Sequence, residues 1–215
     1  MLTPQVPVAK EGYPFIAFAA FCTFVLALLD LPAATTVSLV ATTFVLYFFR
    51  DPERFVPTGD QALVSPADGK VIQVERVQTN PFTEMAAVKI SIFMNVFNVH
   101  VNRIPFPGKV EKIVYKPGKF YSADSAKGGL ENEYCAAVIA TAAGKKVAFV
   151  QIAGLIARRI VCWLEPGDEV TRGRRFGLIR FGSRVDLYLP LETELLIKVG
   201  DKVRGGETLL GRLRP

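Results

Sequence analysis

The sequence predicts a mainly β protein that begins with an apolar helical hairpin. Two observations point to this fold. Residues 1–57 hold two long uncharged apolar runs, and residues 58–215 hold many short apolar segments punctuated by glycine and proline. The 215 residues suffice for one domain of ordinary size with an accessory segment. We therefore expect a membrane-associated hairpin with a basic exit over residues 1–57 and a globular domain over 58–215.

The two apolar runs cover residues 12–29 and 31–49, which are 18 and 19 residues without charge. At about 1.5 Å per helical residue, each run reaches roughly 27–29 Å, close to one hydrocarbon core. Only Asp30 separates the runs, and Pro32 follows it. Because proline breaks a helix and a carboxylate avoids the bilayer centre, these two residues predict the tip of the hairpin.

Two other interpretations of the apolar runs compete with the hairpin. A removed signal peptide is disfavoured because no basic cluster precedes the first run and no small-residue cleavage site separates the two. A buried helical pair in a soluble core stays open. Lys10 flanks one end and Arg50 and Arg54 the other, so the positive-inside rule puts both ends in the cytoplasm. We expect a protein of the cell membrane with its globular domain on the cytoplasmic side.

The formal net charge is +6, with dense basic spots at residues 158–159 and 172–175. This pattern fits a solvated basic face or a face held against anionic headgroups. Without a basic helix or an aromatic-rich RNA motif, nucleic acid is not an expected partner. The three cysteines, Cys22, Cys135 and Cys162, show neither a disulfide framework nor metal spacing. With one histidine in the chain, no metal site is expected.

From about residue 62 onward the chain is predicted to form short strands. Alternation of apolar and polar residues is visible over residues 71–75. Residues 152–159 fit either a short helix or a strand. The strand-like segments are residues 64–77, 87–94, 99–104, 108–115, 136–154, 158–164, 175–181, 184–190, 193–200 and 208–213.

A weak internal repeat suggests a duplicated architecture. The segment GDEVTRG at residues 167–173 recurs as GDKVRGG at 200–206, 33 residues later. A similar echo links DGKV at 68–71 with PGKV at 107–110. Such hairpin turns occur in barrel-sandwich folds of the lipoyl and biotinyl type, so two half-barrels are the expected arrangement. Two unrelated hairpin turns would give the same pattern.

The dipeptide Gly182-Ser183 is the first candidate for chemistry, because it lies between two strand-like runs about thirty residues from the C-terminus. His100 is the only imidazole. A single histidine beside apolar neighbours is more often a hydrogen-bonded core residue than a catalyst. Asp68 stands before a glycine, which is ordinary turn chemistry. Each signal is weak by itself.

Together these signals have a specific order and spacing. With their flanking residues they resemble the phosphatidylserine decarboxylase family in its short form, over about residues 48–190. The matching segments are FFRDPER (48–54), SPADGKV (65–71), FNVHVNRIP (97–105), ENE (131–133), QIAGLIARRI (151–160) and RFGLIRFGSRVDLYLP (175–190).

The resemblance implies that the protein cuts itself between Gly182 and Ser183 and converts Ser183 into a pyruvoyl group. Glycine suits this position because it tolerates a strained backbone and lets the serine hydroxyl reach the carbonyl carbon. By resemblance, His100 is the base and Asp68 orients it, as in a Ser-His-Asp set. The products are residues 1–182 and residues 183–215, which stay partners of one another.

In the mature enzyme, the resemblance implies that the ketone forms a Schiff base with the serine headgroup of phosphatidylserine and accepts electrons when carbon dioxide leaves. His100 then returns a proton to carbon, which gives phosphatidylethanolamine. Phe93, Phe97 and Phe181 are candidates to line an apolar pocket for the substrate carboxylate. Arg184 is a candidate ligand of the lipid phosphate, and a surface position would explain it equally well.

Two departures from the family pattern concern this site. Long-form members carry a second histidine and a Leu-Gly-Ser-Thr cleavage sequence, whereas this chain has His100 alone and reads Phe-Gly-Ser-Arg at 181–184. His100 must therefore serve both stages, or water must help.

Other functions fit the sequence less well. A non-catalytic barrel-sandwich adaptor on a membrane hairpin leaves Gly182-Ser183 unexplained. A lipoyl carrier needs a lysine at a hairpin tip, and a zinc peptidase needs more than one histidine. The expected partners are phosphatidylserine and membrane lipids, and a homodimer is compatible with the sequence.

Overall fold

The computed structural model describes residues 7–123, 129–155, 159–180 and 182–214. The chain divides into two compact units, residues 1–53 and residues 54–215. The first unit is helical and the second consists of strands and loops. The division lies between Glu53 and Arg54, a few residues before the boundary that the sequence suggests.

The helical unit is a pair of helices joined by a tight turn. A single 3-10 turn at Lys10–Gly12 leads into α1 (Tyr13–Leu28), and α2 covers Pro32–Phe48. Asp30 has a φ of 52°, a left-handed conformation that reverses the chain between the helices. Pro32 is the first residue of α2, where its missing N–H costs no hydrogen bond.

Hydroxyl groups join the two helices along their contact. The Thr23 Oγ1 atom lies 2.8 Å from Ser38 Oγ and 2.9 Å from Thr42 Oγ1. Many apolar side chains of the two helices are exposed, with Phe18, Phe21 and Val37 among the most exposed. Within the described residues, the helix from Lys10 to Leu28 is long and apolar enough to cross a membrane, whereas α2 is shorter.

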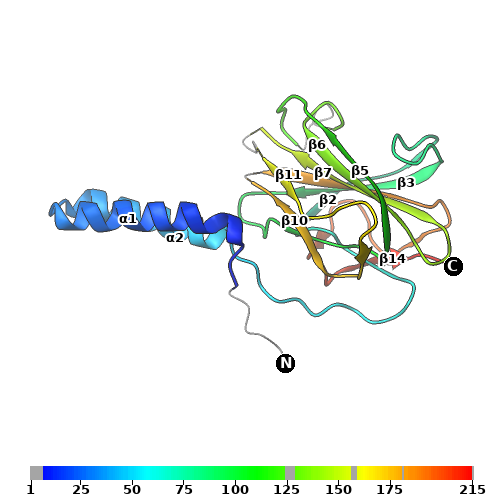
Figure 1. The fold of residues 1–215 in the computed structure, drawn as a ribbon, viewed down its shortest axis with the longest axis horizontal. Helices are drawn as coiled ribbons and strands as arrows, with labels where there is room; N and C mark the ends of the chain where they lie inside the picture. The colour runs from blue at the N-terminus through cyan, green and yellow to red at the C-terminus, as the bar shows by residue number, and fades with distance from the viewer. Residues whose placement is uncertain (1–6, 124–128, 156–158, 181, 215) are drawn as a thin grey trace. The chain divides into compact units, whose positions relative to one another are not determined.

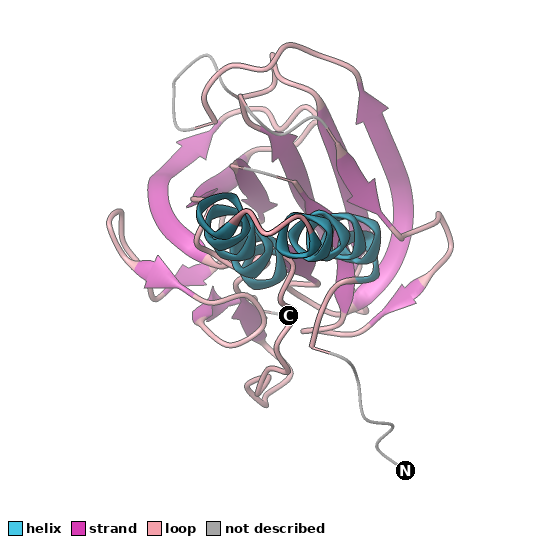
Figure 2. Cartoon of the chain, turned by 90° about the vertical axis from the view of Figure 1, so that its left-hand side faces the viewer, coloured by secondary structure: helices cyan, strands magenta, loops and turns pink. Residues whose placement is uncertain are grey.

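The second unit contains fourteen described strands in three antiparallel sheets (Figures 1 and 2), which confirms the mainly β prediction. The largest sheet has the order β13-β2-β3-β11-β7-β6-β5-β9 and curls into a half-barrel; the smaller sheets are β1-β14-β12 and β4-β10-β8. The strands are β1 (Ala62–Val64), β2 (Gly69–Val77), β3 (Ala87–Met94), β4 (Val101–Arg103), β5 (Gly108–Lys116), β6 (Tyr134–Ala140), β7 (Lys146–Ala153), β8 (Ile160–Cys162), β9 (Glu169–Val170), β10 (Arg175–Ile179), β11 (Ser183–Leu189), β12 (Glu194–Leu195), β13 (Lys202–Val203) and β14 (Leu209–Arg212).

The large sheet buries apolar side chains on both faces. On β11, Val185, Leu187 and Leu189 belong to the main core, and Tyr188 belongs to a second cluster. Successive residues of a strand point to opposite faces, which explains the division. The segment over 152–159 is strand up to Ala153, the end of β7, and residues 156–158 lie outside the described residues.

The two copies of the repeated turn make matching contacts. The Gly167 N–H donates to Val110 O at 2.7 Å, and the Gly200 N–H donates to Val71 O at 2.8 Å. Through these turns β9 pairs with β5 and β13 pairs with β2, at the two ends of the large sheet. The equivalence concerns the turns and their pairings, and a duplicated barrel-sandwich stays a prediction.

Two cysteines that are far apart in sequence meet in the core. Cys135 lies on β6 and is buried, and Cys162 lies on β8 and is half-buried. A hydrogen bond from the Cys135 thiol, reinforced by the Leu164 backbone, lowers the pKa of Cys162 to about 7. The same bond and burial raise the pKa of Cys135. The interaction therefore favours the thiolate at Cys162 over the thiolate at Cys135.

Alkylation of Cys162 should follow this lowered pKa. Because the thiolate is the nucleophile, its reaction with iodoacetamide should rise through a midpoint near pH 7. Replacement of Cys135 with alanine removes the hydrogen-bond donor and should move the midpoint upward. Peptide mass spectrometry after brief labelling between pH 6 and pH 10 measures it. A midpoint at the ordinary thiol value of about 8.5 in the unchanged chain would contradict the interaction.

Candidate active site

Ser183 lies at the head of the central strand of the large sheet. It is the first residue of β11, and it pairs with Met94 of β3 on one side and Ala153 of β7 on the other. The residue is 0 % exposed. Its hydroxyl donates to the thioether sulfur of Met94, with 3.4 Å between Oγ and Sδ. The hydroxyl is thus held in an apolar setting that excludes bulk water.

Gly182 turns the chain into this strand with a backbone that favours glycine. Its φ is +71°, in the left-handed region. Apart from its chain neighbours, no described residue has an atom within 4 Å of where a side chain would begin, so conformation and not crowding selects glycine. The bond that the sequence singles out therefore joins a left-handed glycine to a buried serine.

The carbonyl of Gly182 is held by a second glycine. The Gly154 N–H donates to Gly182 O at a distance of 3.1 Å. A β-carbon at position 154 would lie 2.3 Å from this oxygen, closer than side-chain atoms approach. Only glycine allows the two backbones to come this near. The sequence analysis did not single out Gly154, whose one signal is that a glycine ends the strand-like run of residues 136–154.

His100 lies immediately before β4 and is 2 % exposed. Its Nδ1 atom is 2.9 Å from the carbonyl oxygen of Asn98. Because a carbonyl only accepts, Nδ1 carries the proton in the neutral ring, and Nε2 is then the basic nitrogen. The His100 carbonyl accepts from the N–H of Ile179, three residues before Gly182. The histidine is thus attached to the strand that leads into the Gly-Ser bond.

Asp68 lies in the loop between β1 and β2 and is mostly buried. Its Oδ2 atom is 2.8 Å from Arg54 Nη2, and its Oδ1 atom accepts from the Gly205 N–H at 2.7 Å. Arg54 also pairs with Glu207 at 3.2 Å. Each carboxylate oxygen can accept more than one hydrogen bond, so these contacts leave room for a further donor.

The loop that carries Asp68 runs beside the segment that carries His100. Pro66 O accepts from the Arg103 N–H at 2.8 Å, and the Val64 N–H donates to Pro105 O at 3.0 Å. The structure therefore brings the two segments together, and the orienting role of Asp68 stays a prediction.

A buried amide chain borders the serine and was not foreseen from the sequence. Asn102 Nδ2 lies 3.6 Å from Met94 Sδ, and Gln151 Nε2 donates to Asn102 Oδ1 at 2.9 Å. Both amides are 0 % exposed. Met94 also receives the Ser183 hydroxyl, so it joins the serine to these amides. A polar residue at an inward position of an otherwise apolar strand, as in VAFVQIA, is the signal that could have found Gln151.

Arg184 forms an ion pair with the carboxylate of Asp186. Its guanidinium makes two bonds to Asp186, through Nε and through Nη2 at 2.8 Å, and Nη2 also donates to Ser91 Oγ at 2.9 Å. The side chain is buried and lies on the opposite face of β11 from Ser183. A contact with lipid phosphate stays a prediction, and the charge of this arginine is already paired.

The three candidate phenylalanines are in different settings. Phe93 pairs with Arg184 across β3 and β11, so it lies on the same face as that arginine. Phe97 follows β3 and is 62 % exposed. Phe181 lies outside the described residues. Their role in lining a substrate pocket stays a prediction.

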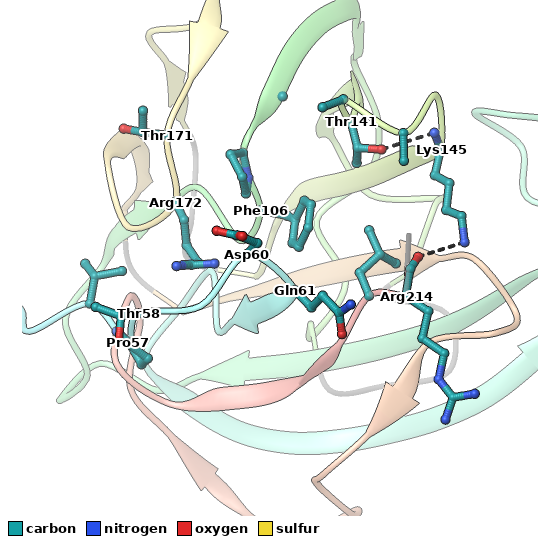
Figure 3. Close-up of a pocket in the computed structure, with 16 residues that line it drawn as sticks. Pro57, Thr58, Asp60, Gln61, Phe106, Thr141, Lys145, Thr171, Arg172 and Arg214 are labelled. Carbon is teal, nitrogen blue, oxygen red and sulfur yellow. Dashed lines mark hydrogen bonds between the residues drawn. The ribbon is translucent and has the colours of Figure 1, made fainter.

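One cavity of the second unit lies away from Ser183. It has a volume of about 760 Å³ and includes Thr141 and Lys145, next to the start of β7 (Figure 3). Ser183 pairs with the other end of β7, about 23 Å away for an eight-residue strand. Lys145 binds Glu192 and the Arg214 carbonyl, and Arg172 binds the carbonyls of Gly59 and Ala62. The candidate active site is therefore the head of β11, where the residues singled out by the sequence lie. Among residues 7–123, 129–155, 159–180 and 182–214, no cluster of three or more His, Cys, Asp or Glu side chains could hold a metal ion.

Comparison with known proteins identifies the family. Residues 41–211 match the family model described as phosphatidylserine decarboxylase. The phosphatidylserine decarboxylase proenzyme of Desulfotalea psychrophila is 65% identical over 213 residues, covering 99% of this chain and 100% of that protein. The proenzymes of Pelobacter propionicus and Geotalea uraniireducens are 49% and 50% identical, each again with 99% of this chain and 100% of the relative covered. The chain therefore belongs to the phosphatidylserine decarboxylase family, whose members are decarboxylases.

Proposed function

We propose that this protein cuts its own chain between Gly182 and Ser183 and then, with a pyruvoyl group formed from Ser183, decarboxylates phosphatidylserine to phosphatidylethanolamine. One observation carries the proposal. A buried serine hydroxyl follows a left-handed glycine whose carbonyl is fixed by the Gly154 amide. Family membership supplies the substrate.

The first stage is an acyl shift within the chain. Ser183 Oγ bonds to the Gly182 carbonyl carbon, the C–N bond breaks, and an ester replaces the amide. Loss of the α-proton of residue 183 then expels the Gly182 carboxylate and leaves dehydroalanine. Its imine tautomer takes up one water and releases ammonia, which leaves a ketone. The sequence of steps balances without an oxidant or a reductant.

The backbone around the bond suits this shift. As Oγ attacks, negative charge develops on Gly182 O, and the Gly154 N–H already points at that oxygen from 3.1 Å. A donor that is fixed in advance stabilises the oxyanion without reorganisation. Gly154 is therefore the donor that we assign to the cleavage step.

His100 is the residue that we assign to proton transfer. Its Nδ1–H is fixed on Asn98 O, which leaves Nε2 to accept the serine proton in cleavage and to return a proton to carbon in turnover. Asp68, on the neighbouring loop, is the group that we assign to orienting the imidazole. Its own position is fixed by Arg54 and Gly205.

The surroundings of Ser183 fit a pyruvoyl group. When formed, the ketone supplies an electron sink for decarboxylation. Position 183 is buried beside Met94, so the site excludes water from the reacting centre. The strand that carries it stays paired with β3 and β7, both of which belong to the 1–182 fragment.

We also propose that the protein acts at the cell membrane with residues 54–215 on the cytoplasmic side. The apolar helix α1 and the basic residues that flank the hairpin support this location. The phospholipid substrate and the surrounding lipids would be its partners, together with the two fragments themselves.

Self-cleavage is tested most directly by intact mass. We expect fragments of residues 1–182 and 183–215, the shorter one without a free N-terminal amine and lighter than a chain that begins with serine. Ser183→Ala should leave a single chain and abolish decarboxylation. Denaturing electrophoresis with mass spectrometry measures both. One intact chain from a preparation that decarboxylates phosphatidylserine would contradict the proposal.

The role of Gly154 is tested with a matched substitution. Gly154→Ala should push the Gly182 carbonyl from its donor and slow self-cleavage about 10²- to 10³-fold, the range for loss of one oxyanion donor. Gly108→Ala is the control, because a β-carbon there would lie 2.4 Å from the Ala140 carbonyl, a similar clash in the same sheet. The control should lose similar thermal stability and still cut itself. Equal cleavage rates in the two variants would remove Gly154 from the step.

Replacement of His100 with alanine tests the base. Self-cleavage should slow by about 10²- to 10⁴-fold, the usual contribution of a positioned base. The time course of fragment formation after synthesis measures the rate, and circular dichroism checks that the strands are intact. Cleavage at the unchanged rate would assign the proton transfer to another group.

A further inference from the structure

The strand end that carries Ser183 also carries two exposed loops. Ser183 pairs with Met94 and with Ala153, so β3 and β7 end level with the head of β11. Residues 95–98 leave this end after β3, and residues 154–155 leave it after β7. We call residues 95–98, 154–155, 159, 180 and 182 the Ser183 edge.

This edge holds unusual apolar exposure. Apart from Phe55, which is 93 % exposed at the start of the second unit, Leu155 and Phe97 are the most exposed large apolar side chains that the structure describes there, at 64 % and 62 %. Neighbouring strands lie about 4.8 Å apart, so the ends of β3 and β7, on either side of β11, are about 10 Å apart. Phe97 lies three residues after the end of β3 and Leu155 two residues after the end of β7, so the two side chains belong to loops at the same end of the sheet. Exposed apolar groups that gather at one end of a domain can form an interaction site.

The charge of the edge is positive. Arg159 is exposed and pairs through its carbonyl with the N–H of Arg180, so both arginines belong to this end of the unit. The described residues of the Ser183 edge include no Asp or Glu. The acid beside them is Glu133, next to Ala153, and it accepts a hydrogen bond from Tyr115. Apolar tips with adjacent cations match an anionic lipid surface.

We propose that Phe97 and Leu155 enter the surface of the bilayer that holds the substrate, with Arg159 among the headgroups. This inference rests on the proposed function, because it takes the substrate to be a bilayer phospholipid. Ser183 is fully buried yet is the first residue of its strand, so the shortest approach to it passes through this edge. A docked lipid would then need to move only its headgroup toward the strand.

Contact with the bilayer is measured with a tryptophan probe. The chain has one tryptophan, so Trp163→Phe gives a silent background in which Phe97→Trp reports on the edge. Met85→Trp is the control, because Met85 is 54 % exposed near the opposite end of β3. In full-length protein reconstituted into vesicles of brominated phosphatidylcholine and phosphatidylserine, we expect quenching at position 97 at least threefold stronger than at position 85. Equal quenching at positions 97 and 85 would overturn the proposal. Burial of position 97 against a second copy of the chain, and not in lipid, would also overturn it.

Activity supplies an independent test. Leu155→Asp should lower decarboxylation of phosphatidylserine in vesicles at least tenfold more than decarboxylation of a soluble short-chain phosphatidylserine. Leu191→Asp, beyond the far end of β11 and also exposed, should leave both rates unchanged. Equal losses of both activities in Leu155→Asp would overturn the docking role. Formation of the two fragments is measured in every variant and in the unsubstituted protein. If the unsubstituted protein is folded but uncut, the proposed function fails and the docking surface is not the cause.

Discussion

The hydrogen bond from the Gly154 amide to the Gly182 carbonyl is the contact on which the proposed chemistry of this fold depends. It follows directly on the ladder that pairs β11 with β7, whose last pair is Ser183 with Ala153. It fixes the direction of the carbonyl that the serine would attack, and it requires glycine at position 154. The left-handed backbone of Gly182 is the second requirement, because it turns the chain from β10 into this position.

Features that depend on residues close together in the chain could be predicted from the sequence. Asp30 and Pro32 interrupt two apolar runs, and the structure has its helical turn there. Strand-like alternation likewise appears as strands in 54–215. The contacts around Ser183 were not foreseen because they are long-range. Gly154 meets Gly182 across 28 residues, and Gln151 meets Asn102 across 49. Sequence periodicity gives strand faces but not strand partners, so such contacts follow only from the register.

Charge shows the same limit of sequence reasoning. The basic excess suggested either a solvated face or a face for lipid headgroups, yet several arginines are bound to other groups of the protein. Arg172 binds two backbone carbonyls, Arg54 holds Asp68, and Arg184 is paired with Asp186. Buried arginines need such partners, because an uncompensated buried charge is costly. The charge that remains for a membrane surface therefore depends on position, and Arg159 is the exposed example beside Ser183.

The Gly-Ser bond lies at the start of a central strand. At this position a cut in the chain is compatible with an intact sheet. The proposed cleavage would free the Gly182 carbonyl, but β11 would stay paired on both sides, through seven residue pairs with β3 and six with β7. The short fragment also supplies β14 to β1 and β13 to β2. The chain can thus be cut without loss of its sheets, because noncovalent pairing and not the peptide bond holds the fragment. The same pairing would keep the new ketone in the buried position from which the serine began.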